Sequence, residues 1–341
     1  MTDILEVDPE VRRNPDDEDY ASTGYDTSIA SLSSSVHEYI FENGRRYHAY
    51  YGPDQYLMPQ DEKEKDRLDL HHEIILQLFE GQLHQAPLQN PHRILDVGTG
   101  TGIWAIGRYP ILRTKRALSG NMADKFPEAE VIGTDLSPIQ SGWVPANCRF
   151  EVDDATLDWT YTDNHFDFIH GRSVGQGFDD WGKLLSEMKC CTVPGGWVEI
   201  CECGIRANCD DGTMADNNAC KIFIDLLRQA LIKIKRPPID DIETLRQRFE
   251  ATGFEDIRIK TVKEPIGPWT RDERMKKIGA MVLLHCESVY EAYGVATFTK
   301  LLGMDRDEAK RICENAIASS RNKNYHLYSI FYNVCGRKPL E

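Results

Sequence analysis

A glycine-rich loop near residue 100 constrains the fold of this chain more than any other feature. Residues 93–97 (RILDV) form a short apolar run typical of a buried strand, and Gly98, Gly100 and Gly102 follow it at alternate positions. Glycine suits a backbone that turns sharply and approaches a ligand, because no Cβ atom stands in the way. An apolar run that opens a helix comes next, so the sequence predicts a strand, a ligand-binding loop and a helix in that order.

Strand-like and helix-like segments keep alternating after this loop. Further strands are expected at residues 130–134, 149–152, 166–170, 197–203, 257–262 and 326–334, with a turn at Pro194–Gly196. Helices are expected at residues 62–79, 181–191, 213–235 and 242–251, and through most of 271–319. This alternation predicts an α/β fold of the Rossmann-like kind, with a mostly parallel sheet and right-handed connections.

The spacing of the glycines separates two classes of cofactor. Dinucleotide-binding folds use the pattern G-x-G-x-x-G, but Ile103 stands where its third glycine would be. A nicotinamide-dependent oxidoreductase is therefore disfavoured. Asp96 lies two residues before the first glycine, and its carboxylate can help to hold an ammonium group, directly or through the loop. The loop thus favours a cofactor with a methionine moiety and no phosphates, the structural alternative being a turn without a ligand.

Acidic residues end the next two strands. Asp135 can accept hydrogen bonds from both hydroxyls of a ribose, although it could also cap a helix that begins after Leu136. Asp154, beside Ala155, can accept a hydrogen bond from the exocyclic amine of adenine. Asp153 is the weaker candidate, since it could serve only as a cap. The pattern predicts an adenosine site at this edge of the sheet.

The fourth strand ends at His170, beside the expected position of the reactive group. His170 could contact the cofactor through its backbone or side chain, or it could be structural. Arg172 could bind an anionic acceptor or pair with an acid. His170, Tyr47, Tyr50 and Glu199 are candidates for a general base, and nothing ranks them. The sequence therefore assigns no catalytic residue.

Charge and cysteine usage limit the partners and the compartment. A formal net charge of −15 disfavours direct binding to nucleic acid or to an anionic membrane surface. We expect no membrane span, because no run of 18 uncharged apolar residues occurs. The ten cysteines include no C-x-x-C pair, so no metal site is expected. Scattered cysteines without a signal peptide fit a reducing compartment, the cytoplasm or the nucleus.

Composition divides the chain into four stretches. Residues 1–30 are acidic and then rich in serine and threonine, which predicts a disordered tail. Residues 31–90 are expected to form a helical cap segment with many aromatic side chains. Residues 91–204 are the predicted cofactor-binding core, and residues 205–341 hold helical cap insertions and the remaining core strands. We expect the caps to cover the cofactor and build an acceptor pocket, the alternative being that they only extend the core.

Several motifs together resemble the LaeA-like (UMTA-type) methyltransferases of filamentous fungi, a group within the class I methyltransferases. The resemblance runs from about residue 32 to Pro339 and is carried by residues 43–50 (NGRRYHAY), 66–72 (DRLDLHH), 95–105 (LDVGTGTGIWA), 131–140 (VIGTDLSPIQ), 166–172 (FDFIHGR), 194–199 (PGGWVE) and 265–269 (PIGPW). It implies S-adenosylmethionine as cofactor, a sheet of seven strands with the last antiparallel, and a role in secondary metabolism. The residues expected to bind the cofactor are Asp96, Gly98, Thr99, Gly100, Gly102, Asp135, Leu136, Asp154, Ala155 and His170.

One departure from the family pattern follows the glycine loop in the sequence. Asp96 and Asp135 are 39 residues apart, which is longer than the family spacing, and the excess lies at Gly107–Asn121. Pro110 would break the helix expected there. The excess is either a surface insertion that loops out of the helix end or an intron read through in a gene model. Its basic, apolar and non-periodic composition favours the second explanation.

These observations predict an S-adenosylmethionine-dependent methyltransferase whose acceptor the sequence does not identify. The alternative is a regulatory or scaffolding protein that binds the cofactor with little or no methyl transfer and acts through a protein partner.

Overall fold

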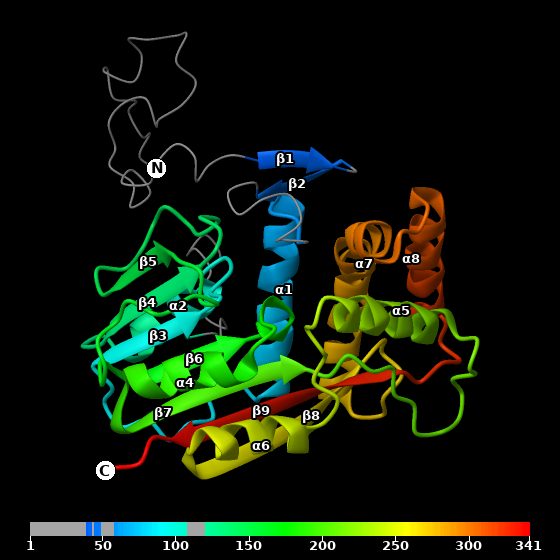
Figure 1. Cartoon of the computed structure of the whole chain (residues 1–341). Coiled ribbons are helices and arrows are strands. Elements are labelled where there is room, and N and C mark those ends of the chain that lie inside the picture. Colours follow the sequence, from blue (N-terminus) through cyan, green and yellow to red (C-terminus); the bar gives the residue numbers. More distant parts are fainter. Residues whose placement is uncertain (1–38, 43, 49–57, 108–119) are drawn as a thin grey trace, which may run out of the picture.

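The computed structural model describes residues 39–42, 44–48, 58–107 and 120–341, and it centres on one seven-stranded sheet (Figure 1). The strand order is β5-β4-β3-β6-β7-β9-β8, and β9 runs antiparallel to the other six strands of this sheet. The predicted Rossmann-like sheet with an antiparallel last strand is therefore confirmed. The strands are β3 (Arg93–Val97), β4 (Glu130–Asp135), β5 (Cys148–Val152), β6 (Phe166–Arg172), β7 (Thr192–Cys203), β8 (Glu255–Pro265) and β9 (Tyr328–Arg337).

Helices cover both faces of this sheet. Ile94 and Phe168 point into an apolar cluster with α1, α2 and α3, while Leu95 and Ile169 point into a second cluster with α4 and α6. Successive residues thus alternate between two buried faces, as expected for central parallel strands. The helices of these two layers are α1 (Glu62–Leu78), α2 (Ile103–Ile106), α3 (Met122–Lys125), α4 (Trp181–Cys191) and α6 (Ile242–Thr252).

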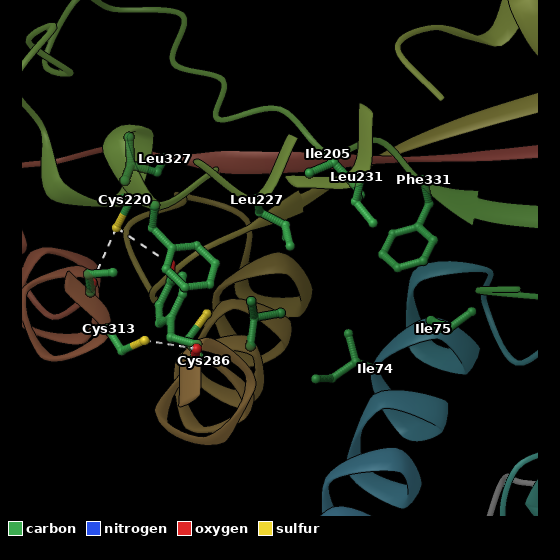
Figure 2. Close-up of a cluster of buried hydrophobic side chains, with 14 of the residues drawn as sticks. Ile74, Ile75, Ile205, Cys220, Leu227, Leu231, Cys286, Cys313, Leu327 and Phe331 are labelled. Carbon is green, nitrogen blue, oxygen red and sulfur yellow. Dashed lines mark hydrogen bonds between the residues drawn. The ribbon is translucent and has the colours of Figure 1, made fainter. Parts of the chain in front are cut away.

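Three further helices form a cap beside the sheet, and α1 stands between the sheet and this cap (Figure 1). Ile74 and Ile75 of α1 share an apolar cluster with side chains of the cap helices, and Figure 2 shows these two groups facing each other. The cap is therefore packed on the core through α1. Its helices are α5 (Ala219–Lys233), α7 (Glu273–Leu302) and α8 (Arg306–Ser320).

Capping groups explain one helix start that was predicted wrongly and the break within a helical region that was predicted correctly. The helix expected from residue 213 begins at Ala219, because the Asn218 side chain accepts hydrogen bonds from the backbone N–H groups of Cys220 and Lys221. The helical region expected at 271–319 is divided into two helices. Gly303 ends the first of them with a left-handed φ of 71°.

Three strands also differ from expectation. The turn expected at Pro194–Gly196 was wrong, since this segment is the irregular start of β7, where the register shifts between Phe166 and Phe168 of β6. β8 and β9 pair along most of their length, so β8 extends beyond the expected 257–262 and β9 runs to Arg337. Sheet pairing therefore lengthens strands that the sequence pattern only partly marks.

The described part of the predicted N-terminal cap segment contains a hairpin before its helix α1. β1 (Tyr39–Glu42) and β2 (Arg45–His48) pair antiparallel. Arg45 donates to both carboxylate oxygens of Asp61, at 2.6 and 2.9 Å, and Asp61 caps the N-terminus of α1. The hairpin is thus anchored to the start of α1. The tail predicted at residues 1–30 lies outside the described residues.

The two ends of the long interval behind the glycine loop lie side by side. α2 ends at Gly107, and α3 begins directly after Asn121. A Cβ atom added to Gly107 would lie 2.8 Å from Nδ2 of Asn121. Residues 108–119 are outside the described part of the chain, so the choice between an insertion and an intron stays a prediction.

Candidate functional site

A cleft of about 340 Å³ opens at the carboxyl edge of the parallel strands. Open α/β sheets bind ligands at this edge. Its walls come from the residues that follow β3, β4, β5 and β6, and from α5 and α7 across from them. The predicted residues on these walls are Gly98, Asp135, Leu136, Asp154 and Ala155.

The glycine loop has a shape that only glycine permits. Gly98, Gly100 and Gly102 all have left-handed φ values, of 66°, 58° and 77°. A Cβ atom on Gly102 would lie 2.3 Å from the ring of Phe150, and one on Gly98 would lie 2.6 Å from Val174. The loop therefore forms a closely packed backbone cradle, of which Gly98 lines the cleft.

Asp135 supports this cradle from the next strand. Its carboxylate accepts hydrogen bonds from the backbone N–H of Gly100 at 2.8 Å and of Ser137 at 3.0 Å. Burial raises the pKa of Asp135 to about 6, although these hydrogen bonds act in the opposite direction. Near neutral pH the side chain is mostly ionised, and it can accept hydrogen bonds from a ligand in the cleft.

Both acids after β5 reach the cleft. Asp154 accepts hydrogen bonds from the backbone N–H and the hydroxyl of Thr156, at 3.0 and 2.7 Å. Asp153 accepts one from the backbone N–H of Asp154, at 2.8 Å. The structure thus places the weaker candidate, Asp153, on the same wall as Asp154.

Asp96, Thr99 and His170 lie behind the cleft rather than on its walls. The Thr99 hydroxyl donates to Asp96 at 2.6 Å, and Nδ1 of His170 lies 2.7 Å from the other carboxylate oxygen. The His170 ring stacks on Trp104, with centroids 4.1 Å apart. These contacts hold the base of the glycine loop. Gly100 and Gly102 also lie outside the cleft lining.

The described candidates for a general base, His170, Tyr47 and Glu199, do not line the cleft. Glu199 accepts hydrogen bonds from the backbone N–H groups of Gln85 and Ala86, at 2.8 and 2.7 Å, and from Asn333 at 2.8 Å. Burial raises the pKa of Tyr47 to about 12. Tyr50 lies outside the described residues.

Arg172 is half-buried and does not line the cleft either. Its guanidinium contacts Nδ1 of His72 at 2.9 Å, and the Asp96 carboxylate lies near it. Burial lowers the pKa of Arg172, although the nearby Asp96 carboxylate acts in the opposite direction. This side chain belongs to the packing between β6 and α1.

A second cavity, of about 150 Å³, adjoins the cleft under the cap. Ser173, Gln176 and Tyr293 line both cavities. Ser173 directly follows β6 and has a left-handed φ of 56°, which is uncommon for serine. The junction between the two spaces is therefore built by the loop after β6 and by α7.

The sequence motifs did not single out several residues of these walls. Gln176 belongs to the short 3-10 helix Gly175–Gly177, while Arg236 and Tyr293 come from the cap. No motif marks them, because their place depends on how the cap helices pack on the core. The amphipathic pattern of the cap helices was the available signal, and it indicated a covering role without naming residues.

Comparisons with known proteins decide the family. The family model described as "Methyltransferase domain" matches residues 68–259. Methyltransferase pytC of Aspergillus terreus is 34% identical over 326 residues, which cover 95% of each chain. The chain belongs to the methyltransferase family. Its cofactor is S-adenosylmethionine, as the glycine loop predicted.

Other relatives of this methyltransferase are named as regulators. Secondary metabolism regulator LAE1 of Cochliobolus heterostrophus is 35% identical and covers 88% of this chain and 95% of its own. Secondary metabolism regulator laeA of Aspergillus flavus is 33% identical and covers 92% and 81%. The expected resemblance to the LaeA-like group is therefore confirmed. A solved structure, phosphoethanolamine N-methyltransferase 2 of Haemonchus contortus in complex with S-adenosyl-L-methionine, aligns with a TM-score of 0.43 and 19% identity over 85% of this chain and 55% of that one.

The structure also bears on two expected absences. In the described residues of this methyltransferase, no helix is long and apolar enough to cross a membrane. Within the same residues, no group of His, Cys, Asp or Glu side chains could hold a metal ion. All ten cysteines lie in the described part of the chain and are free thiols.

Proposed function

We propose that this protein transfers a methyl group from S-adenosylmethionine to a small organic acceptor that binds under the helical cap, as a step in secondary metabolism. One observation carries the proposal: the second cavity meets the cofactor cleft at Ser173, Gln176 and Tyr293. A small molecule there would reach the cleft from inside the protein. A protein acceptor would need an open approach to the same junction.

In this proposal, different residues of the cleft bind different parts of the cofactor. Asp135 accepts hydrogen bonds from the ribose hydroxyls, with Leu136 beside it. Asp154 and Ala155 hold the adenine. The backbone of Gly98–Gly102 approaches the methionine moiety, and Asp96, Thr99 and His170 act indirectly by holding that loop in shape.

Bound S-adenosylmethionine supplies a methyl group activated by its sulfonium sulfur. The protein's own contribution is orientation and the exclusion of water, because α5 and α7 cover the cleft from the side opposite the strands. A general base is needed only where the acceptor must lose its proton early. We assign none of the described side chains to that role.

Asp135→Ala tests the cofactor site. We expect the affinity for S-adenosylhomocysteine to fall roughly 10–100-fold in calorimetry, because a charge-assisted pair of hydrogen bonds is lost. Asp158→Ala is the matched control, since Asp158 is an exposed acid that pairs with Lys183 and does not line the cleft. Equal affinities in the two variants would remove Asp135 from the site.

A second candidate function is regulation through a protein partner, favoured by the names of the relatives laeA and LAE1. The two candidates separate in one assay of radiolabelled methyl transfer to small-molecule extracts and to proteins. Label in small molecules supports the main proposal, and label only in protein, or in neither, supports the regulator. For either function we place the protein in the cytoplasm or nucleus, on the basis of its acidic charge and ten free thiols.

A further inference from the structure

The cavity under the cap is lined mainly by apolar side chains. Figure 2 shows five of them gathered where α5 and α7 meet the ends of β7 and β9: Ile205, Cys220, Leu227, Cys286 and Leu327. Its volume of about 150 Å³ is comparable to that of an apolar cavity that admits benzene. The space therefore suits an apolar group about the size of one ring.

One polar side chain in this lining has an unused hydrogen-bonding atom. Glu264 lies near the end of β8 and is 5% exposed. Its Oε2 accepts a hydrogen bond from the Ser329 hydroxyl at 2.9 Å, whereas Oε1 is buried without a partner among the described residues. An unsatisfied buried oxygen is costly, so a ligand group that pairs with it would be favoured. Glu264 lines this cavity and not the cofactor cleft.

The charge state of Glu264 allows either direction of hydrogen bonding. Burial raises its pKa to about 7, so near neutral pH the carboxyl group is protonated about half of the time. The protonated form can donate to a carbonyl or hydroxyl oxygen, and the ionised form can accept from a hydroxyl or amide.

The other polar groups of the lining do not form an anion site. Arg67 donates to both carboxylate oxygens of Glu64, at 2.6 and 3.0 Å, and Arg206 lies 3.9 Å from Asp240. The pocket's arginines thus already face carboxylates.

The two imidazoles of the lining are uncharged, so they do not form an anion site either. His71 and His285 stack with ring centroids 4.7 Å apart. Burial, together with the nearby Arg67, holds the pKa of each well below its usual range. A negatively charged ligand would therefore meet arginines that already have a carboxylate within 4 Å, and it would meet Glu264.

We propose that this pocket binds an apolar, ring-sized part of a neutral acceptor, and that a hydroxyl, carbonyl or amide group of the acceptor pairs with Glu264. The inference rests on the proposed methyl transfer, since it specifies the chemistry of the acceptor for that same site. Ser173, Gln176 and Tyr293 then mark the side on which the acceptor meets the cofactor cleft.

Three small probes test the chemistry: phenol, benzene and benzoate, titrated by calorimetry into protein saturated with S-adenosylhomocysteine. We expect phenol to bind about tenfold more tightly than benzene, because it alone pairs with Glu264 without adding charge. Benzoate should bind most weakly, since its carboxylate meets Glu264. In Glu264→Leu the preference for phenol over benzene should disappear while benzene still binds.

A pair of tryptophan variants tests whether the probes bind in this pocket. Ile224→Trp fills the pocket from α5, whereas Ile222→Trp adds the same bulk at an exposed position of the same helix that does not line it. We expect Ile224→Trp to lose probe binding, and Ile222→Trp to keep it.

The affinity for S-adenosylhomocysteine, measured on the same samples, separates this inference from the proposed function. If the cofactor product binds but phenol shows no preference that depends on Glu264, the acceptor chemistry is wrong. Tightest binding by benzoate, or unchanged probe binding in Ile224→Trp, would overturn it equally. If the wild-type protein binds no S-adenosylhomocysteine, the proposed function itself fails.

Discussion

At the scale of residues, two carboxylates, one half-buried and one buried, tie the loops of the site to the strands beside them. Asp135 at the end of β4 accepts from the loop after β3. Glu202 near the end of β7 accepts from the loop after β6, through the backbone N–H groups of Val174 and Gly175 at 2.7 and 2.9 Å. Each acid thus fixes the backbone of a neighbouring strand's loop, which is a stronger constraint than contacts between side chains alone.

Gly102→Ala should destabilise the fold more than a change at a comparable glycine. Gly102 and Gly81 have similar left-handed φ values, 77° and 80°, but only the Cβ at residue 102 would meet another group, the ring of Phe150. Backbone strain costs roughly 1–2 kcal/mol at either site, and overpacking adds roughly 1–3 kcal/mol at residue 102. Urea unfolding of both variants measures the difference, and equal losses would argue against the close contact.

Glu202→Gln should become stabilising as the pH rises. Burial raises the pKa of Glu202 to about 7, so between about pH 4.5 and 7 the folded protein holds a proton that the unfolded chain releases, and stability falls as pH rises. Glutamine keeps the accepting Oε1 and cannot ionise. We expect a gain of roughly 1–3 kcal/mol at pH 8 and little change below pH 5.

Urea unfolding at the two pH values tests the Glu202 prediction. The relevant quantity is the difference between variant and wild type at each pH, because other groups titrate in both proteins. A difference that stays constant with pH would show that Glu202 is ionised in the folded protein with an ordinary pKa, for example through its attraction to Arg248.

At the scale of elements, the helix behind the glycine loop is divided into two short pieces whose facing ends touch. α2 and α3 have four residues each, and both contribute buried side chains to one apolar cluster, among them Trp104 and Met122. Both helices therefore cover the same face of the sheet. A segment between two ends that lie this close adds little loop-closure cost, since that cost grows slowly with length.

Deletion of residues 108–119 should therefore leave the fold intact. The deletion joins Gly107 to Gly120, whose neighbour Asn121 already lies beside Gly107. We expect an unchanged or higher melting temperature and unchanged affinity for S-adenosylhomocysteine. Loss of cofactor binding in a folded deletion variant would show that the segment contributes to the site.

The sequence predicted most elements of this fold, but not the strand ends and side-chain positions that neighbouring elements determine. Glycine spacing, strand ends and alternation foretold the sheet and the edge that holds Asp135 and Asp154. They could not foretell that β7 begins before Pro194, because a bulge against β6 decides it. They could not place Tyr293 at the cleft, because only the packing of α7 on α1 and α5 brings it there. They also could not show that His170 is enclosed by Asp96 and Trp104.

At the scale of the whole molecule, core and cap share the cleft. Leu231 and Arg236 reach it from the end of α5, Tyr293 and Thr297 from α7, and the strand ends from the other side. The apolar cluster that joins α1 to the cap holds these two parts in place. Ligand binding should therefore restrict the opening of both walls of the cleft.

Hydrogen exchange tests this sharing. With saturating S-adenosylhomocysteine we expect slower amide exchange in residues 231–236 of the cap as well as in the glycine loop, because a bound ligand suppresses the opening of both walls. Residues 306–320 of α8 do not line the cleft and serve as the internal reference. Protection confined to the core would mean that the cap does not close on the cofactor.

The place of β9 has a consequence for how the chain is made. Within the described sheet, β8 pairs only with β9. β9 lies between β8 and β7 and follows β8 in the sequence. During synthesis β8 can therefore join the sheet only after β9, which follows it in the chain, has been made. A truncation that removes β9 would thus leave one edge of the sheet unassembled, although every residue that lines the cleft would still be present.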